Sequence, residues 1–119
     1  MKVIECLNEF SDLIETIEII EYKKEEHVSI TKIKLRLLDA TILWIREVKY
    51  HEDVVAYSYY WLRSDNSVII GWDNAPHHKE VNTFPHHKHV GKKVEPSEQT
   101  DIRQVMKFIR NFLEGSSQS

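Results

Sequence analysis

The chain has 119 residues, of which 41% are hydrophobic and 29% are charged, and its formal net charge is −3. This length and composition predict one soluble, globular domain that can bury a core. No apolar run approaches the ~20 residues of a membrane span, the N-terminus lacks the apolar core of a secretory signal, and the single Cys6 excludes an internal disulfide. We therefore expect a cytoplasmic protein.

The charge is distributed unevenly along the chain. Residues 1–26 hold three lysines against eight acidic residues, a balance of −5, whereas residues 77–93 hold four lysines against one glutamate, a balance of +3. A positive segment suits a phosphate-bearing partner, and a solvated charged surface is the alternative interpretation.

The first predicted element is an amphipathic helix over residues 2–12. Its apolar positions recur at helical spacing: Val3, Leu7, Phe10 and Ile14. This spacing places one apolar stripe against a core. Cys6 lies on the same helix and is expected to be a small buried apolar group.

From about residue 15 to residue 73 the apolar period changes to two, which predicts strands. The clearest strand alternates Ile33, Leu35 and Leu37 with Lys32, Lys34 and Arg36. Four further strands are expected around residues 17–19, 42–48, 55–61 and 68–72. The breaks between the strands are short enough for hairpins and too short for parallel crossovers, so we expect an antiparallel meander of five strands. Val28 and Ile30 differ in parity from Ile33, so a bulge or two-sided burial is expected near Thr31.

The C-terminal element is predicted to be a second amphipathic helix. Its apolar face holds Ile102, Val105, Met106, Ile109, Phe112 and Leu113. Thr100 is the expected N-cap and Gly115 the expected C-cap. The fold class is therefore α+β: a single domain over residues 1–115, in which N-terminal and C-terminal helices flank the meander, followed by a disordered tail at residues 116–119.

The most unusual segment is rich in histidine. Five of the seven histidines fall between residues 77 and 89: His77, His78, His86, His87 and His89. Proline precedes each His-His pair, and Gly71 and Gly91 bound the segment, so most of it should be an exposed loop. Loops on a rigid scaffold concentrate binding and catalytic residues.

Three interpretations of this loop remain open. The case for metal-ion binding is weakened because no cysteine lies near the loop and no HExxH or CxxC spacing occurs, so we expect no metal and no cofactor. Acid–base residues and phosphate ligands would suit metal-free RNA cleavage. A purely structural role would have the imidazoles bond to loop carbonyls.

Two features beside the loop also have two interpretations. Tyr57, Tyr59 and Trp61 share one strand face, with Tyr60 on the other, and such aromatic faces either stack nucleobases or form core. Asp73 either orients a histidine or begins an Asx-turn.

The motifs themselves resemble those of the TumE family, proposed toxins of prokaryotic type II toxin–antitoxin pairs. The resemblance covers most of the chain and is carried by YSYYW, WDNAPHH, TFPHHKHVG and VEPSE. It implies a small intracellular protein that a helix-turn-helix antitoxin neutralises. Two positions depart from the family pattern: Tyr60 stands in place of histidine, and Gly71 stands in place of arginine. If those side chains act in catalysis, this chain is a weakened or inactive member.

The leading hypothesis is a toxin that acts on RNA as a metal-independent ribonuclease. The candidate catalytic residues are His77, His78, His86, His87 and His89, expected to converge on one concave face beside the fourth strand. The candidate substrate-binding residues are Arg36, Tyr59, Asp73, Asn74 and Lys88. The alternative is a non-enzymatic binding module or a metal-binding protein that uses the same loop.

The expected partners are a cognate antitoxin and RNA, with no membrane. The chain is expected to act as a homodimer or within a heteromeric toxin–antitoxin complex. We expect the antitoxin to cover the cationic loop, because acidic side chains could mimic phosphates. Docking on the acidic N-terminal helix is the alternative.

Overall fold

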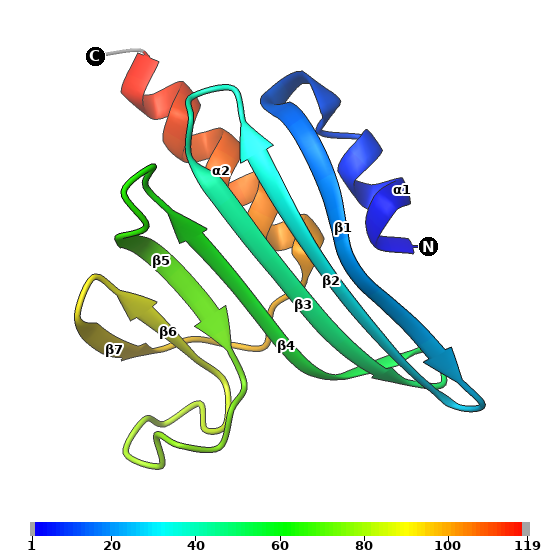
Figure 1. Cartoon of the computed structure of the whole chain (residues 1–119). Helices are drawn as coiled ribbons and strands as arrows, with labels where there is room; N and C mark the ends of the chain where they lie inside the picture. The colour runs from blue at the N-terminus through cyan, green and yellow to red at the C-terminus, as the bar shows by residue number, and fades with distance from the viewer. Residues whose placement is uncertain (1, 118–119) are drawn as a thin grey trace.

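The computed structural model describes residues 2–117, which form an α+β fold of two α-helices and one antiparallel sheet (Figure 1). In chain order the elements are α1 (Lys2–Asn8), a 3₁₀ turn (Ser11–Leu13), β1 (Ile14–Glu25), β2 (Val28–Leu37), β3 (Ile42–Tyr50), β4 (Asp53–Leu62), β5 (Val68–Asp73), β6 (His87–Val90), β7 (Lys93–Pro96) and α2 (Ile102–Ser117). None of the helices within this range is both long and apolar enough to cross a membrane.

The α+β class and the antiparallel meander are confirmed, but the sheet has seven strands rather than five, in the order β1 to β7. The two missed strands form a hairpin in the segment expected to be loop. β6 pairs with β5 from Val90, opposite Ile70, to His87, opposite Asp73. A four-residue strand with two histidines and a lysine lacks the apolar alternation by which a sequence predicts a strand. Its extended shape comes from backbone pairing with β5.

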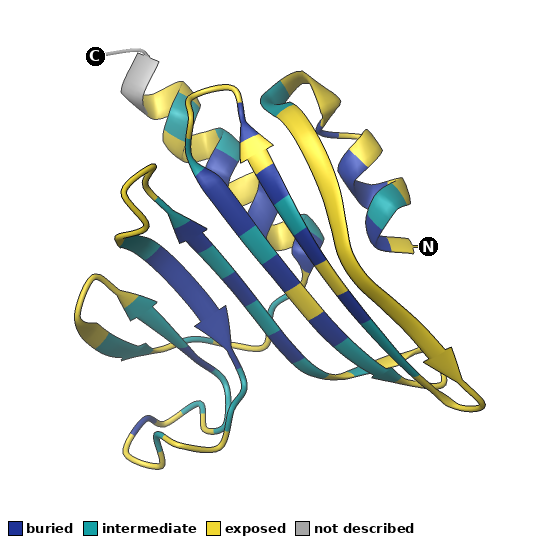
Figure 2. Cartoon of the chain, in the orientation of Figure 1, coloured by how far each residue is buried: buried dark blue, intermediate teal, exposed yellow. Residues whose placement is uncertain are grey.

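Both helices pack on one face of the sheet, and α2 passes behind the strands in the view of Figure 1. Alternate residues of β2 to β5 point to that face and are buried (Figure 2). The core cluster comprises Val3, Cys6, Leu7, Phe10, Ile33, Leu35, Leu37, Leu43, Ile45, Tyr57, Tyr59, Trp61, Ile70, Trp72, Ile102, Val105, Met106 and Ile109. The period-two and helical patterns thus predicted most of the core.

Several local expectations need correction. The register shift lies in β1, between Ile19 and Glu21, whereas β2 pairs regularly with β3, so the bulge near Thr31 falls on the neighbouring strand. The N-cap of α2 is one residue later than expected, because Asp101 Oδ1 accepts a hydrogen bond from the Gln104 backbone N–H at 2.9 Å.

The expected C-cap is also wrong, since α2 runs through Gly115 to Ser117. The C-terminal half of the expected tail, residues 118 and 119, lies outside the described residues.

The face turned away from the helices, which we call the open face, carries two rows of aligned side chains. Strand pairing sets the first row as Lys32, Arg46, Ser58, Asp73 and His87, and the second row as Lys34, Trp44, Tyr60, Gly71 and His89. Because side chains alternate along a strand, both rows lie on the side opposite the core. The rows lead from cations on β2 and β3 to imidazoles on β6.

Candidate functional site

Three of the five expected histidines converge beside the C-terminal end of β5. His87 and His89 are alternate residues of β6 and point to the open face, and His78 reaches them from the β5–β6 loop. The ring centroids are 4.9 Å apart for His78 and His87, 4.9 Å for His87 and His89, and 5.5 Å for His78 and His89. We call these three residues the histidine cluster.

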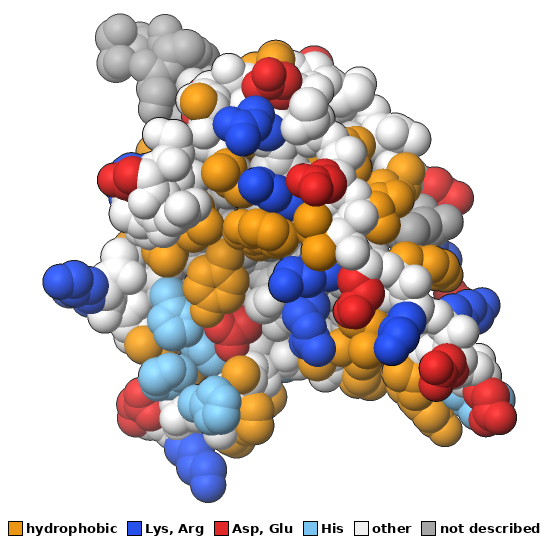
Figure 3. Space-filling view, in the orientation of Figure 1, with side chains coloured by type: hydrophobic (Ala, Val, Ile, Leu, Met, Phe, Trp, Pro, Cys, Tyr) orange, Lys and Arg blue, Asp and Glu red, His pale blue; other side chains and the backbone are white. Residues whose placement is uncertain are grey.

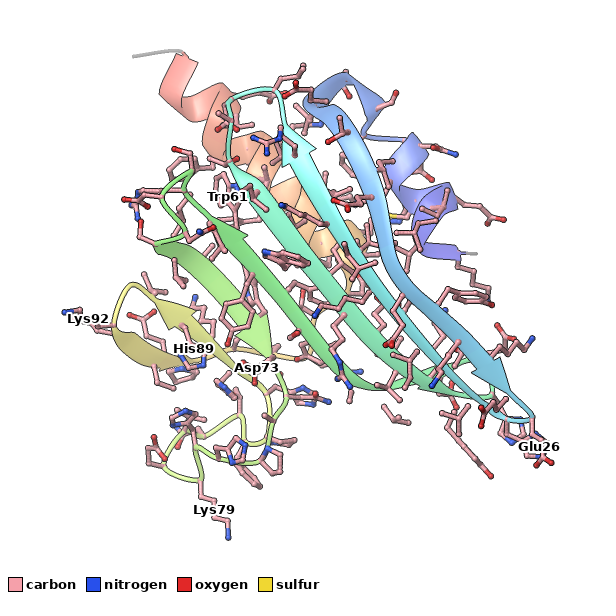
Figure 4. The ribbon with its side chains drawn as sticks, in the orientation of Figure 1. Glu26, Trp61, Asp73, Lys79, His89 and Lys92 are labelled. Atoms are coloured by element: carbon pink, nitrogen blue, oxygen red, sulfur yellow. The ribbon has the colours of Figure 1, made fainter. Side chains whose placement is uncertain are left out.

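Asp73 is the carboxylate of this site, and Figure 4 shows it beside His89 at the adjoining ends of β5 and β6. Its Oδ1 lies 3.0 Å from His87 Nε2, and its Oδ2 lies 3.5 Å from His89 Nε2. Oδ1 also accepts the Ala75 backbone N–H at 3.0 Å. Asp73 therefore orients histidines and forms an Asx-turn at the same time, so the two interpretations of this residue were compatible.

His87 is the buried centre of the cluster, with a relative exposure of only 1%. Its Nδ1 lies 2.9 Å from the Pro85 carbonyl oxygen, which can only accept, so Nδ1 is a donor. Its Nε2 faces Asp73. An acceptor thus faces each ring nitrogen of His87.

His78 and His89 are half-buried and form the accessible part of the cluster. Burial lowers the pKa of His89 below its ordinary value, and the charge of Asp73 opposes that shift. Nδ1 of His78 lies 3.1 Å from Glu80 Oε1. Two imidazoles in different surroundings at the surface can exchange protons with a ligand.

Tyr60 completes the site by reaching Asp73 from the second row. Its hydroxyl donates a hydrogen bond of 2.5 Å to Asp73 Oδ2, and burial is the main cause of its raised pKa. The Tyr60 ring lies over Gly71, where an added Cβ would overlap with the ring carbons Cγ, Cδ1 and Cε1. The two departures from the expected motif, at positions 60 and 71, are therefore neighbours that fit each other.

The other two expected histidines are not in the cluster. His77 is exposed, and its backbone N–H bonds to the Ala75 carbonyl. The His86 Nδ1 lies 2.8 Å from the Tyr57 hydroxyl, and the two rings stack. Lys88 pairs across strands with Trp72, a core residue, so it lies on the helix-covered side. Strand alternation separates Lys88 from the cluster, because the expected loop is a strand here. His86 precedes that strand and lies beside Tyr57 instead.

Two expected substrate-binding residues, Tyr59 and Arg36, lie elsewhere, whereas Asn74 lines a groove beside Asp73 and Tyr60. Tyr59 is fully buried, and its hydroxyl donates to Glu47 Oε2 at 2.6 Å, so it cannot stack a base. The Asn74 side chain accepts from the Tyr57 backbone N–H and donates to the Val55 carbonyl, which ties the chain after β5 to β4. Arg36 is exposed on β2, four strands from β6, or about 19 Å at the usual strand spacing.

The open face supplies groups that the motif search missed. Two ammonium groups lie over the Trp44 ring, Lys32 Nζ at 5.4 Å and Lys34 Nζ at 5.5 Å from its centroid. Arg46 stands next in the first row. β1 places Glu18 opposite Lys34 and Glu21 opposite Lys32, so the positive charge is partly balanced at that edge. The parity of β2 and β3 could have identified these residues, since the buried positions alternate with them.

Figure 3 shows this surface, with histidines gathered beside an acidic group and basic side chains across the middle of the sheet. A groove of about 710 Å³ lies between the two regions, and its lining includes Arg46, Ser58, Tyr60, Asp73, Pro76 and Pro85. The groove is continuous with the histidine cluster through Asp73 and Tyr60. The groove therefore lies between basic side chains and imidazoles, so it offers space for an extended anionic ligand beside titratable groups.

Comparison with protein-family models matches residues 3–117 to a family described as Toxin TumE. The match begins in α1 and ends in α2, so it includes every strand of the sheet and the whole histidine cluster. No curated protein and no solved structure matched the chain.

Proposed function

The chain belongs to the TumE toxin family, and on that premise we propose that it cleaves RNA through the histidine cluster, without a metal. The observation that carries the proposal is the convergence of three imidazoles, two of which face Asp73, at the end of two rows that bear cations and aromatic rings. A protein that only bound RNA would not require titratable groups gathered at one end of its binding face.

The proposed step is an internal transfer of the RNA phosphate. A base removes the proton of a 2′-hydroxyl, and the 2′ oxygen attacks the adjacent phosphorus. The bond between phosphorus and the 5′ oxygen breaks, and an acid protonates that oxygen. The products carry a 2′,3′-cyclic phosphate and a 5′-hydroxyl.

His78 and His89 are the residues we assign to proton transfer, because both are half-buried and can touch a substrate. His87 and Asp73 are nearly inaccessible, with exposures of 1% and 7%, so we assign them to orientation and charge balance. The Tyr60 hydroxyl holds Asp73 from the other side. Groups of this kind stabilise a transition state most when their positions are fixed before the substrate binds.

The open face is the proposed path for the RNA strand. Arg46 and the two lysines beside Trp44 would contact phosphates, and the exposed part of the Trp44 ring would stack a base. A strand laid along the rows would enter the groove at Ser58 and Tyr60 and end at the histidine cluster.

A toxin family implies an antitoxin partner. We propose that this partner covers the open face and blocks the substrate by occlusion. His86 and Lys88 lie on the helix-covered side, so the antitoxin would recognise His78, His89 and Arg46. In the proposed toxin–antitoxin complex, the antitoxin therefore covers the open face of the sheet.

Untagged, EDTA-treated protein incubated with an RNA pool tests the proposal, with DNA of the same sequence as the control. We expect RNA to be cut to cyclic phosphate ends and DNA, which lacks the 2′-hydroxyl, to stay intact. His89→Ala should reduce the rate by roughly 10²–10⁴, whereas His51→Ala, in the β3–β4 turn, should cleave like the parent. Absence of cleavage in every RNA pool would overturn the metal-free ribonuclease.

A further inference from the structure

The geometry points to a binding site for one transition-metal ion of the zinc type, formed by His78, His87 and His89. One potential ligand atom from each of these residues lies within 4.8 Å of the other two. Imidazole nitrogen is a preferred ligand of Zn²⁺ and of neighbouring transition ions, whereas Mg²⁺ and Ca²⁺ prefer oxygen. The donor set therefore selects the class of ion.

Contacts at the Nδ1 atoms of His87 and His78 leave the Nε2 atom of each ring as the potential metal ligand. His87 donates Nδ1–H to the Pro85 carbonyl, and Nδ1 of His78 faces the Glu80 carboxylate. A histidine that binds a metal through one nitrogen usually donates its other N–H to a carbonyl or carboxylate. These contacts direct Nε2 of both residues toward a shared ion.

Asp73 supplies a carboxylate beside the proposed ion and fills, or holds a water in, the fourth coordination position. Its oxygens lie 3.0 Å and 3.5 Å from the Nε2 atoms of His87 and His89. An ion held by the three imidazoles would lie beside this carboxylate, which either binds it directly or holds a bound water. Three protein nitrogens with one further oxygen satisfy the tetrahedral preference of zinc.

The cluster has to contract slightly around an ion. Zinc–nitrogen bonds of about 2.0–2.1 Å place tetrahedral ligand atoms about 3.4 Å apart, whereas the three potential ligand atoms here lie within 4.8 Å of one another. Half-buried His78 and His89 can rotate toward buried His87, which the Pro85 carbonyl and Asp73 fix in place. The fixed ring is the anchor, and the two accessible rings close on the ion.

Metal binding itself does not depend on the proposed ribonuclease activity, but its consequence does. The ion would occupy the ring nitrogens of His78 and His89 that are assigned to proton transfer. A bound metal and metal-free RNA cleavage would then exclude each other. Zinc would hold the toxin in an inactive state.

Calorimetric titration of the full, untagged, metal-stripped chain with ZnCl₂ tests the site, with MgCl₂ as the control ion. We expect one Zn²⁺ per chain and no detectable Mg²⁺ binding. His78→Ala and His89→Ala should each weaken Zn²⁺ binding by more than about tenfold, since even loss of an outer partner costs that much. His77→Ala and His51→Ala, which remove exposed histidines outside the cluster, should bind zinc like the parent.

Circular dichroism of each variant separates loss of ligands from loss of fold. Failure of the folded parent to bind Zn²⁺, or an equal loss of affinity in His77→Ala and His89→Ala, overturns the metal site. Cleavage assays on the same samples keep the two proposals apart. If the parent binds zinc but the metal-stripped protein does not cleave RNA, the site is supported and the metal-free ribonuclease is removed. If the metal-stripped protein cleaves RNA but the parent does not bind zinc, the ribonuclease is supported and the metal site is removed. Cleavage that requires zinc supports the site and overturns the metal-free mechanism.

Discussion

Tyr59 and Tyr60 are consecutive residues of β4, and each donates its hydroxyl to a carboxylate on a neighbouring strand. Tyr59 bonds to Glu47 at 2.6 Å in the core, and Tyr60 bonds to Asp73 at 2.5 Å on the open face. Only the second carboxylate also faces imidazoles, those of His87 and His89. The same pairing lies in the core on one face and beside the histidine cluster on the other, so its neighbours differ.

The helix-covered face should tolerate truncation far less than the open face. Trp61 is fully buried and donates its indole N–H to Thr41 Oγ1, whereas Trp44 is half-buried on the open face. We expect Trp61→Ala to lower the free energy of unfolding by about 3–5 kcal/mol, the usual cost of emptying such a site. Trp44→Ala is the matched control and should cost clearly less. Urea unfolding measures both, and equal losses would contradict the division into two faces.

On the open face, the fit between Tyr60 and Gly71 should be sensitive to a single methyl group. Gly71→Ala introduces a Cβ into the space of the Tyr60 ring and should destabilise the fold by about 1–3 kcal/mol. The same change in a Tyr60→Ala background should cost less, because the overlapping ring is gone.

A double-mutant cycle measured by urea unfolding gives the coupling between the two positions. Gly115→Ala is the control: a Cβ there meets nothing within 4 Å, and alanine favours a helix. Additive effects of the changes at Tyr60 and Gly71 would show that the steric argument fails.

The smallest expected effect concerns Arg46 and the salt dependence of RNA binding. Each phosphate contact on a single strand contributes about 0.7 to the slope of log affinity against log salt, so Arg46→Ala should lower that slope by about 0.7. Fluorescence anisotropy over a salt series measures it, in a His89→Ala background so that the RNA is not cut. Arg63→Ala, in the exposed β4–β5 turn, is the control. An unchanged slope in Arg46→Ala would place the RNA path elsewhere.

The sequence alone determined the elements that bury apolar surface. Alternation at Ile33, Leu35 and Leu37 predicted β2, and helical spacing at Val105, Met106 and Ile109 predicted α2, because burial imposes the period of the element on apolar residues. It also directed attention to the histidine-rich segment, whose composition packing does not explain. The family resemblance that the motifs carried is confirmed by the match over residues 3–117.

Only the tertiary structure decided which histidines lie together. Pairing with β5 turns the end of the expected loop into β6, which sends His87 and His89 to Asp73 and leaves His86 beside Tyr57. Chain neighbours therefore diverge. His78 joins the cluster from the other end of the loop, across residues that show no metal-ligand spacing. A short strand formed through backbone hydrogen bonds to its neighbour needs no side-chain pattern of its own. The sequence therefore carried no signal for β6, nor for which histidines this strand places beside Asp73.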